Sequence, residues 1–439
     1  MIKFLSLLVF FLFTALVFAE DESAERDVLR YGTDNEISEL IKSLKKDNSS
    51  YLDDALVSLL KSTKNSVIKS QVISFFAERG KEGVEDEALS LIEKREDAEP
   101  AAVLAAIDYI GKVKYSGAQK TLRQLLEDDD ERWKNPALRA IGAAAGKSKA
   151  DSADTAKFLI EYYKTKSPPE DTMREIITAL GEAGSDAATD FLTEIITGNE
   201  TSVLTVAAIG AAAKIGDKAA LSTIIGALSA KEPNVRAAAV EALGDFEGAD
   251  VNEAVLDAFR DSYWRTRLAA IKSAGKRKLA AAVPYLKFRA EKDEAATVRE
   301  EAVRSLGAIG NKAAADALEE LFDGKRVSDK VKTTAALMLI QTDAGAYAEK
   351  IIAAFDEARR LGQKQFATGL LTALGKAKTE KVRTFTGRLF ASKDAVDKAF
   401  ALELCALNGF SNYRPEVQRL TGEQNSGLSR KARETLQKL

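Results

Sequence analysis

The sequence predicts an all-α fold, an α-α superhelix of about 25 helices in about 12 to 13 hairpins. A ten-residue pattern recurs at intervals of about thirty-two residues through most of the 439-residue chain. Its clearest copies, VRAAAVEALG and VREEAVRSLG, begin at Val235 and Val298. Between the copies lie second segments with helical apolar spacing, and short connections rich in Gly, Asp, Lys and Asn. A repeat of this length indicates one helical hairpin per unit, each stacked on its neighbours.

Residues 1–19 are expected to be a secretory signal peptide. Lys3 supplies the positive start, residues 4–18 are mostly Leu, Phe and Val, and Val17 and Ala19 suit a cleavage site. An uncleaved anchor is the alternative, but an apolar run of about sixteen residues is short for a membrane span. No Cys lies nearby, so a lipoprotein is not expected. The mature protein is therefore expected to be periplasmic or secreted, with no membrane span after cleavage.

Residues 20–35 are acidic and lack a sustained apolar period, so we expect a flexible acidic lead-in there. From 36–439 the chain should form the repeat solenoid, in which the helices that carry the pattern are here called inner helices. Their first positions are Glu36, Ile68, Ala102, Trp133, Thr172, Leu204, Val235, Thr266, Val298, Val331, Phe366, Ala399 and Leu428. Second helices are expected between them, as at Ala118–Glu127, Ala187–Ile196, Ala281–Arg289, Ala313–Phe322 and Ala346–Ala358.

Three positions of the pattern define how the inner helices should pack. Position six is apolar in nearly every copy and position eight is usually Ala or Ser, which predicts a buried stripe with close helix contacts. Gly at position ten should end the helix in a left-handed turn, which a residue without Cβ can adopt. The prolines, Pro136 among them, should fall in connections or near helix starts.

The ends and one wide gap depart from the regular repeat. Glu36 at position one of the first copy and Arg433 at position six of the last indicate polar caps, which terminal units of a stack need. The widest gap separates the copies at Trp133 and Thr172 and contains Ser167-Pro168-Pro169. This gap is the best candidate for a bend.

The composition argues against several classes of function. The chain has no His and one Cys, so His-based catalysis and zinc sites are excluded, and no motif indicates a catalytic residue, cofactor or metal. A net charge of −3 and 7% aromatic residues disfavour nucleic-acid binding. We therefore expect a protein that is not an enzyme. The lone Cys405 is interpreted as a packing residue rather than a disulfide partner.

With these residues in view, the chain resembles the HEAT-repeat superfamily, and within it the short HEAT-like units of phycobilisome lyases. Segments 235–259 and 298–322 carry that family's "VR", "A" and "ALG" elements, a Gly-containing turn and a second apolar helix. The resemblance implies a ladder of Arg and Asp side chains between the ends of adjacent repeats. The ladder positions are Arg236, Arg267 and Arg299, with Lys69, Lys134 and Lys332 as weaker versions, Asp128, Asp261 and Asp293 as acids, and breaks at Val103, Met173 and Thr205.

The resemblance also implies that the inner helices line a concave face. Positions three and seven lie on the sides of an inner helix that burial does not use. Their mixture of small residues and both signs of charge suits a protein or peptide partner better than a polyanion, although a merely solvated face is an open alternative. The partner-binding candidates are Asp108, Arg139, Arg174, Glu241, Lys272, Glu300 and Arg304, with Tyr263 and Trp264 as possible loop contacts.

The leading hypothesis is an exported, non-enzymatic scaffold that binds proteins or peptides along its concave face. One alternative is a structural envelope component that associates with itself. A second, suggested by the resemblance alone, is a HEAT-repeat enzyme such as a bilin-lyase-like protein.

Overall fold

The computed structural model describes residues 22–128, 130–146 and 148–439, so the expected signal peptide lies outside the described residues. The chain divides into two compact units, unit 1 (Met1–Thr223) and unit 2 (Ile224–Leu439). The described residues form helices and short 3-10 turns, with no strand among them. This confirms the all-α repeat fold and the prediction of about 25 helices.

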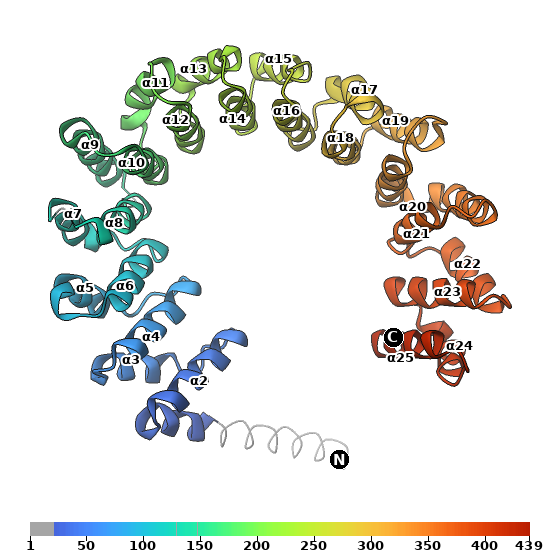
Figure 1. Cartoon of the computed structure of the whole chain (residues 1–439), viewed down its shortest axis with the longest axis horizontal. Coiled ribbons are helices and arrows are strands. Elements are labelled where there is room, and N and C mark those ends of the chain that lie inside the picture. The colour runs from blue at the N-terminus through green and yellow to red at the C-terminus, as the bar shows by residue number, and fades with distance from the viewer. Residues whose placement is uncertain (1–21, 129, 147) are drawn as a thin grey trace, which may run out of the picture. The chain divides into compact units, whose positions relative to one another are not determined.

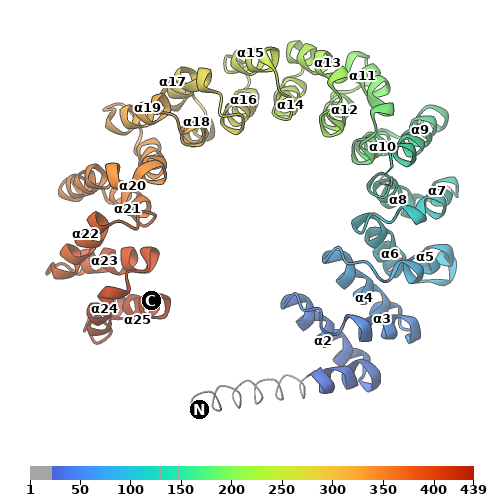
Figure 2. The same cartoon turned by 180° about the vertical axis from the view of Figure 1, so that it is seen from behind.

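Inner and second helices alternate along each unit, and each kind forms its own layer (Figures 1 and 2). The inner helices are α2 (Asp34–Lys46), α4 (Ser66–Glu78), α6 (Pro100–Lys112), α8 (Glu131–Ala143), α10 (Glu170–Ala183) and α12 (Ser202–Ile215), then α14 (Pro233–Leu243), α16 (Trp264–Lys276), α18 (Ala296–Ile309), the first part of α20 (Asp329–Arg360), α21 (Lys364–Leu374), α23 (Ala395–Asn408) and α25 (Ser426–Lys438). Most of them begin two residues before the first position of the predicted pattern.

The second helices occupy the segments between the inner helices, as predicted. They are α3 (Asp53–Ser62), α5 (Glu85–Glu93), α7 (Gln119–Glu127), α9 (Lys149–Lys166), α11 (Thr189–Thr197), α13 (Leu221–Gly226), α15 (Ala249–Ala258), α17 (Val283–Lys292), α19 (Lys312–Asp323), the second part of α20, α22 (Glu380–Ala391) and α24 (Arg414–Leu420). No helix of the described residues is long and apolar enough to cross a membrane.

The region expected to be a flexible lead-in is instead helical over residues 22–31. Leu29 is buried, and the guanidinium of Arg26 donates to both carboxylate oxygens of Asp54 at 2.8 and 3.0 Å. The segment holds too few apolar residues to show a helical period. One buried Leu and one bidentate ion pair nevertheless attach it to the first hairpin.

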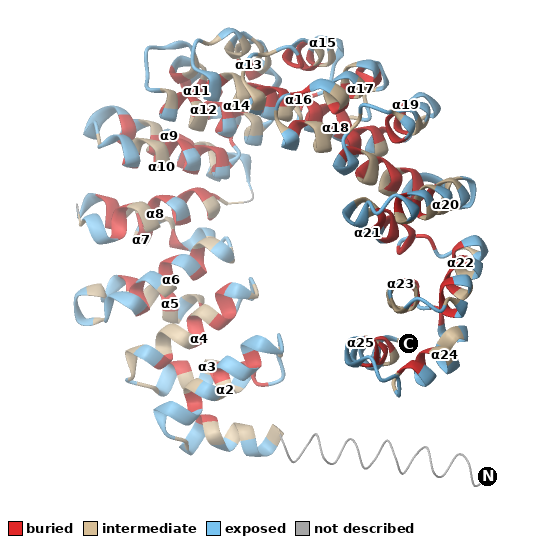
Figure 3. Ribbon diagram, turned by 45° about the vertical axis from the view of Figure 1, so that its right-hand side comes forward, coloured by how far each residue is buried: buried red, intermediate tan, exposed pale blue. Residues whose placement is uncertain are grey.

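The predicted apolar stripe forms the core of each unit, and buried residues follow the sides on which the helices face one another (Figure 3). Position six is buried in every copy before the last, at Ile41, Ile73, Ile107, Leu138, Ile177, Ile209, Val240, Ile271, Val303, Ala336, Leu371 and Leu404, and Leu370 beside it is also buried. In the last helix Arg433 takes this position and is exposed, as expected for a cap.

The glycines at position ten do not form left-handed turns, so that prediction was wrong. Those turns fall three residues later, as at Gly184, whose φ is 66°. Position ten instead brings adjacent inner helices together, because a Cβ on Gly142 would lie 2.5 Å from the carbonyl oxygen of Ala179 and one on Gly275 would lie 2.8 Å from Oγ of Ser305. Ala179 and Ser305 both hold position eight of the following copy, so positions ten and eight form a contact pair at these junctions, whereas Gly375 meets Leu407 at position nine.

One proline and two connections depart from the regular repeat. Pro136 lies inside α8 rather than near its start, so the carbonyl of Arg132 loses its donor four residues along. The extra residues of the widest gap lengthen α9 to 18 residues, and α8 and α10 still pack directly through Gly142. In α20 the non-helical residue Asp343 separates the inner and second helices, and its Oδ1 accepts from the N–H of Ala346 at 2.9 Å.

Candidate partner-binding site

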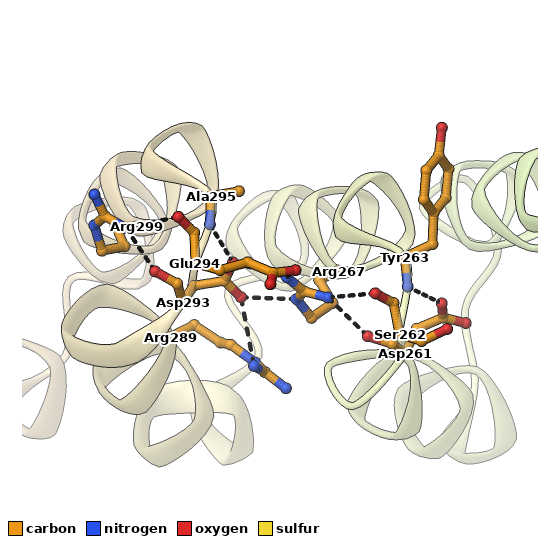
Figure 4. A network of polar contacts seen from close by, with 9 residues as sticks. All are labelled: Asp261, Ser262, Tyr263, Arg267, Arg289, Asp293, Glu294, Ala295 and Arg299. Atoms are coloured by element: carbon orange, nitrogen blue, oxygen red, sulfur yellow. Dashed lines mark hydrogen bonds and ion pairs between the residues drawn. The ribbon is translucent and has the colours of Figure 1, made fainter.

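A ladder of arginine and aspartate side chains joins the repeats of unit 2, and Arg267 is its centre (Figure 4). From the start of α16, Arg267 donates through Nε and Nη2 to both oxygens of Asp293, at 2.7 and 2.8 Å. Its Nη1 donates to the carbonyls of Asp261 and Ser262 at 2.9 and 3.0 Å. The Arg267 and Asp293 side chains are 5% and 0% exposed. One guanidinium therefore binds the preceding connection and the following one.

The same geometry occurs one repeat earlier and ends one repeat later. Arg236 donates to both oxygens of Asp261, at 2.7 and 3.0 Å. Arg299 donates to the carbonyls of Asp293 and Glu294, at 2.6 and 3.0 Å. Arg326 stands six residues before Lys332, where the next acid of the ladder would be. The predicted ladder is thus confirmed from Arg236 to Arg299, where the change of charge ends it.

The two carboxylates of the confirmed ladder, Asp261 and Asp293, are stabilised in their ionised form. Burial by itself would raise the pKa of Asp293, but the hydrogen bonds from Arg267 and from the N–H of Ala295 outweigh it and hold that pKa below its usual range. The pKa of Asp261 is lowered in the same way, against burial, by Arg236 and the N–H of Tyr263. These carboxylates therefore remain charged at any pH at which the protein would work.

The predicted weaker versions of the ladder behave differently. Asp128 pairs with Arg95, not with Lys134. Lys134 is largely buried and donates to Glu131 within its own helix at 2.6 Å. Because position two of that junction is Val103, Arg95 from the preceding connection supplies the cation instead. Among the described residues, Lys69 and Lys332 form no ion pair with an acidic side chain.

Three of the predicted partner-binding residues lie on the inner helices of unit 1. Asp108 pairs with Lys112 one turn along α6, at 2.9 Å. Arg139 on α8 and Arg174 on α10 both approach Glu175, at 3.5 and 3.4 Å, with side chains 60% and 43% exposed. Glu175 itself is 13% exposed. The two arginines therefore share one partly buried carboxylate, and Arg174 also lies 3.8 Å from Asp171.

A hollow of about 470 Å³ lies on this face between α6, α8 and α10. Its floor and walls are mostly apolar or small, and it contains Asp108 and Arg139 of the predicted row. Gly111 lies in the lining and packs closely on α8, because a Cβ there would lie 3.3 Å from the α-carbon of Ala140 and 3.9 Å from Cβ of Ala143. Leu104 stands at the edge with 40% of its surface exposed. The lining residues are Leu104, Ile107, Asp108, Gly111, Lys112, Pro136, Arg139, Ala140, Ala143, Thr178, Ala179 and Glu182.

The other four predicted residues lie on the inner helices of unit 2. Glu241 and Lys272 are exposed, and neither forms an ion pair with any residue that the structure describes. Arg304 binds Glu300 and Glu301 of its own helix, at 3.2 and 3.0 Å. The charges of Glu241 and Lys272 are therefore free for a partner. Those of Glu300 and Arg304 on α18 already neutralise each other.

The predicted loop contacts are built into the start of α16. Tyr263 is the N-cap residue and Trp264 the first helical residue, and both are half-buried. The Tyr263 hydroxyl donates to Oδ1 of Asn234 at 3.2 Å and accepts from Arg265 at 2.8 Å. Arg265 also lies over the Trp264 ring, 5.1 Å from its centroid. Tyr263 thus links α16 to α14.

Cys405 is fully buried in α23, in agreement with its interpretation as a packing residue. Its Sγ lies 3.2 Å from the carbonyl oxygen of Phe410, to which the thiol donates. Burial raises the pKa of the Cys405 thiol to about 12. The thiol therefore stays protonated and unreactive at neutral pH.

Sequence reasoning missed two features of the unit 1 face. Glu175 holds position four of its copy, which the choice of positions three and seven left out. The hollow arises where small residues of three helices coincide, at Gly111, Ala143 and Ala179. The run of small residues at the ends of these inner helices was the available signal, but the depth of the hollow depends on how three repeats stack.

Alternating hairpins, paired positions ten and eight, and the arginine–aspartate ladder together define an α-helical repeat solenoid of the HEAT type. The chain belongs to the family described as Spirochaete HEAT repeat protein, whose model matches residues 29–435. A comparison with curated proteins finds no match.

Solved structures similar to this chain are themselves distant in sequence. Kap121p shares 12% identity, with a TM-score of 0.46, over 94% of this chain and 53% of its own. YibA of Escherichia coli shares 15% identity, with a TM-score of 0.40, over 60% of this chain and 95% of its own. Human deoxyhypusine hydroxylase shares 17% identity, with a TM-score of 0.27, over 63% and 98%.

Proposed function

We propose that this protein is an exported, non-enzymatic scaffold that binds a protein or peptide partner on the face of its inner helices. The hollow between α6, α8 and α10 is the anchor site in this proposal. A hollow of about 470 Å³ accommodates one large side chain of a partner. It is the observation that carries the proposal, because a solvated face needs no such depression.

The charges around the hollow indicate what kind of side chain enters it. Asp108 is paired with Lys112, Arg139 with Glu175, and Glu182 with Lys214. Each charge at the rim is therefore already balanced within the protein, while Leu104 is 40% exposed and Ala143 is partly exposed. This arrangement favours an uncharged apolar side chain at the centre, with polar contacts from the partner's backbone and neighbours around it.

Two further observations support the non-enzymatic and exported parts of the proposal. The chain contains no His, the usual proton-transfer residue near neutral pH, and its one Cys is buried. The first nineteen residues have the composition of a cleavable export signal.

The experiment compares two variants that carry the same substitution at the same register of the repeat. Ala143→Phe fills the hollow on α8, and Ala308→Phe places the same ring at the equivalent, exposed position of α18. Mature protein of each kind is used to capture partners from the native envelope by crosslinking. The expected result is a specific partner that wild type and Ala308→Phe retain and Ala143→Phe loses. Protein recovered from the same envelope should begin at Glu20 by mass spectrometry.

Other outcomes would overturn parts of the proposal. A partner retained equally by all three proteins would remove the hollow as the anchor. Recovery of the chain alone, with larger assemblies in light scattering, would favour a self-associating envelope component. An N-terminus at Met1 would contradict export with cleavage, and a new visible absorption band after incubation with bilins would support the lyase-like alternative.

A further inference from the structure

The outer layer of unit 2 carries a second depression, distinct from the inner-helix face. It lies between the end of α15 and the first half of α17, with a volume of about 270 Å³. Phe259, Pro284, Tyr285 and Phe288 supply its apolar surface, and Arg260 and Arg289 border it. Phe288 is 56% exposed, and the guanidinium carbon of Arg289 lies 5.5 Å from its ring centroid. A largely exposed aromatic ring beside a depression is a common feature of binding surfaces.

The Tyr285 ring of this surface is held in place by its neighbours Phe259 and Arg260. Phe259 is fully buried, and its ring centroid lies 5.6 Å from that of Tyr285. Arg260 covers the other part of the Tyr285 ring, with its guanidinium carbon 5.5 Å from the centroid. Tyr285 is thus fixed between two neighbours, and little conformational entropy would be lost there on binding.

The two arginines are only weakly compensated. Arg289 is 19% exposed, and its acidic contact within the described residues is Oδ2 of Asp293, at 3.4 Å. Both oxygens of Asp293 already accept shorter hydrogen bonds from Arg267. Burial lowers the pKa of Arg289, as expected for a cation that lacks a close counter-charge. The Arg260 side chain is 69% exposed and has Asp257 at 3.7 Å.

A largely exposed ring and two guanidinium groups without close counter-charges match a ligand that carries both an apolar group and an anion. We propose that Phe288, Tyr285, Arg260 and Arg289 form a second docking surface, for a peptide segment with an Asp or Glu beside a large apolar residue. The apolar side chain would contact Phe288 and Tyr285. The carboxylate would accept hydrogen bonds from the arginines, which form the stronger, charge-assisted kind of contact.

The test uses random twelve-residue peptides displayed on phage and the full mature chain. The library is first depleted on the double variant Phe288→Ser, Arg260→Glu, which removes peptides that bind elsewhere, and is then selected on wild type. Peptides that share an acidic residue next to Phe, Trp, Leu or Met are the expected result. Their synthetic forms should bind each single variant about tenfold more weakly or worse, by fluorescence anisotropy.

Matched control variants distinguish binding at this surface from the general effects of removing an exposed apolar side chain or reversing an exposed charge. Leu361→Ser removes an apolar side chain that is 55% exposed in the same unit, and Arg430→Glu reverses an exposed arginine on α25. Both should bind the peptides as wild type does. Replacing the peptide's Asp by Asn should weaken binding to wild type but not to Arg260→Glu. A selection that returns no peptide, peptides without an acidic residue, or peptides insensitive to Phe288→Ser would overturn the proposal.

Discussion

At the residue scale, Arg267 shows how a single side chain joins two repeat junctions. Its guanidinium makes a bidentate contact with Asp293 and also binds two carbonyls of the preceding connection. The Arg267 and Asp293 side chains are buried, so water cannot readily replace the hydrogen bonds between them. Arg299 makes only the carbonyl contacts, since no aspartate follows it. Arg236 and Arg267 therefore both make the full set of ladder contacts, and Arg267 is the more buried of the two.

We predict that Arg267→Ala destabilises unit 2 strongly, whereas Arg304→Ala does not. Removing Arg267 leaves Asp293 as a buried charge without its partner, which costs about 3 kcal/mol or more. Arg304 is 49% exposed, and its ion pairs with Glu300 and Glu301 contribute less than about 1 kcal/mol. Urea unfolding followed by circular dichroism measures both. Equal losses in the two variants would contradict the structural role assigned to Arg267.

The pH dependence of the free energy of unfolding, compared between wild type and Arg267→Ala, gives a sharper test. In wild type the pKa of Asp293 is below its ordinary value, so its contribution to stability is present above about pH 4 and is lost as the pH falls further. In Arg267→Ala, burial dominates and should raise that pKa, so acid favours the folded variant. The stability difference between the two proteins should therefore shrink between pH 7 and pH 3. A difference that stays constant over this range would show that Asp293 is not the coupled group.

At the element scale, the inner helices pack through a pair of small residues that belong to successive repeats. The regular apolar period predicted the buried position six and the small position eight. It could not predict the role of glycine at position ten, because the contact that excludes a Cβ comes from the next repeat. The sequence pattern within one repeat is equally consistent with a left-handed turn, and only the spacing of adjacent helices distinguishes the two.

We predict opposite effects for the same substitution at two helical glycines of unit 1. Gly142→Ala places a Cβ against the backbone of Ala179, so α8 and α10 must separate and stability should fall by about 1–3 kcal/mol. Gly210→Ala, at an exposed position of α12 with no atom within 4 Å of the new Cβ, should raise stability by about 0.5–1 kcal/mol. Chemical denaturation of the two variants measures the signs. Loss of stability at both positions would refute the contact-pair explanation.

The candidate site was only partly predictable from such elements. Asp108 and Arg139 were identified from their register, and both border the unit 1 hollow. The hollow itself depends on the coincidence of Gly111, Ala143 and Ala179 across three helices, which no single repeat encodes. Arg304 was predicted to be available to a partner, but Glu300 and Glu301 neutralise it.

At the scale of the whole molecule, the chain is a linear series of hairpins that contact mainly their neighbours. Stability in such a series is close to a sum of local terms, so surface substitutions on one repeat leave the others folded. This is why Ala143→Phe and Phe288→Ser can report on binding without loss of the fold. It also means that the two proposed surfaces, on different helix layers of different units, can be tested independently.

The central claim is that a partner binds the inner-helix face of unit 1, and site-specific photo-crosslinking in the producing cells tests it most directly. A photoreactive phenylalanine derivative is placed at Thr178, which borders the hollow on α10, or at Asp190, which is exposed on the second helix α11. We predict a discrete crosslinked product from Thr178, its loss when Ala143→Phe is added, and no equivalent product from Asp190. A product from Asp190 alone, or the same product from both positions, would contradict the claim.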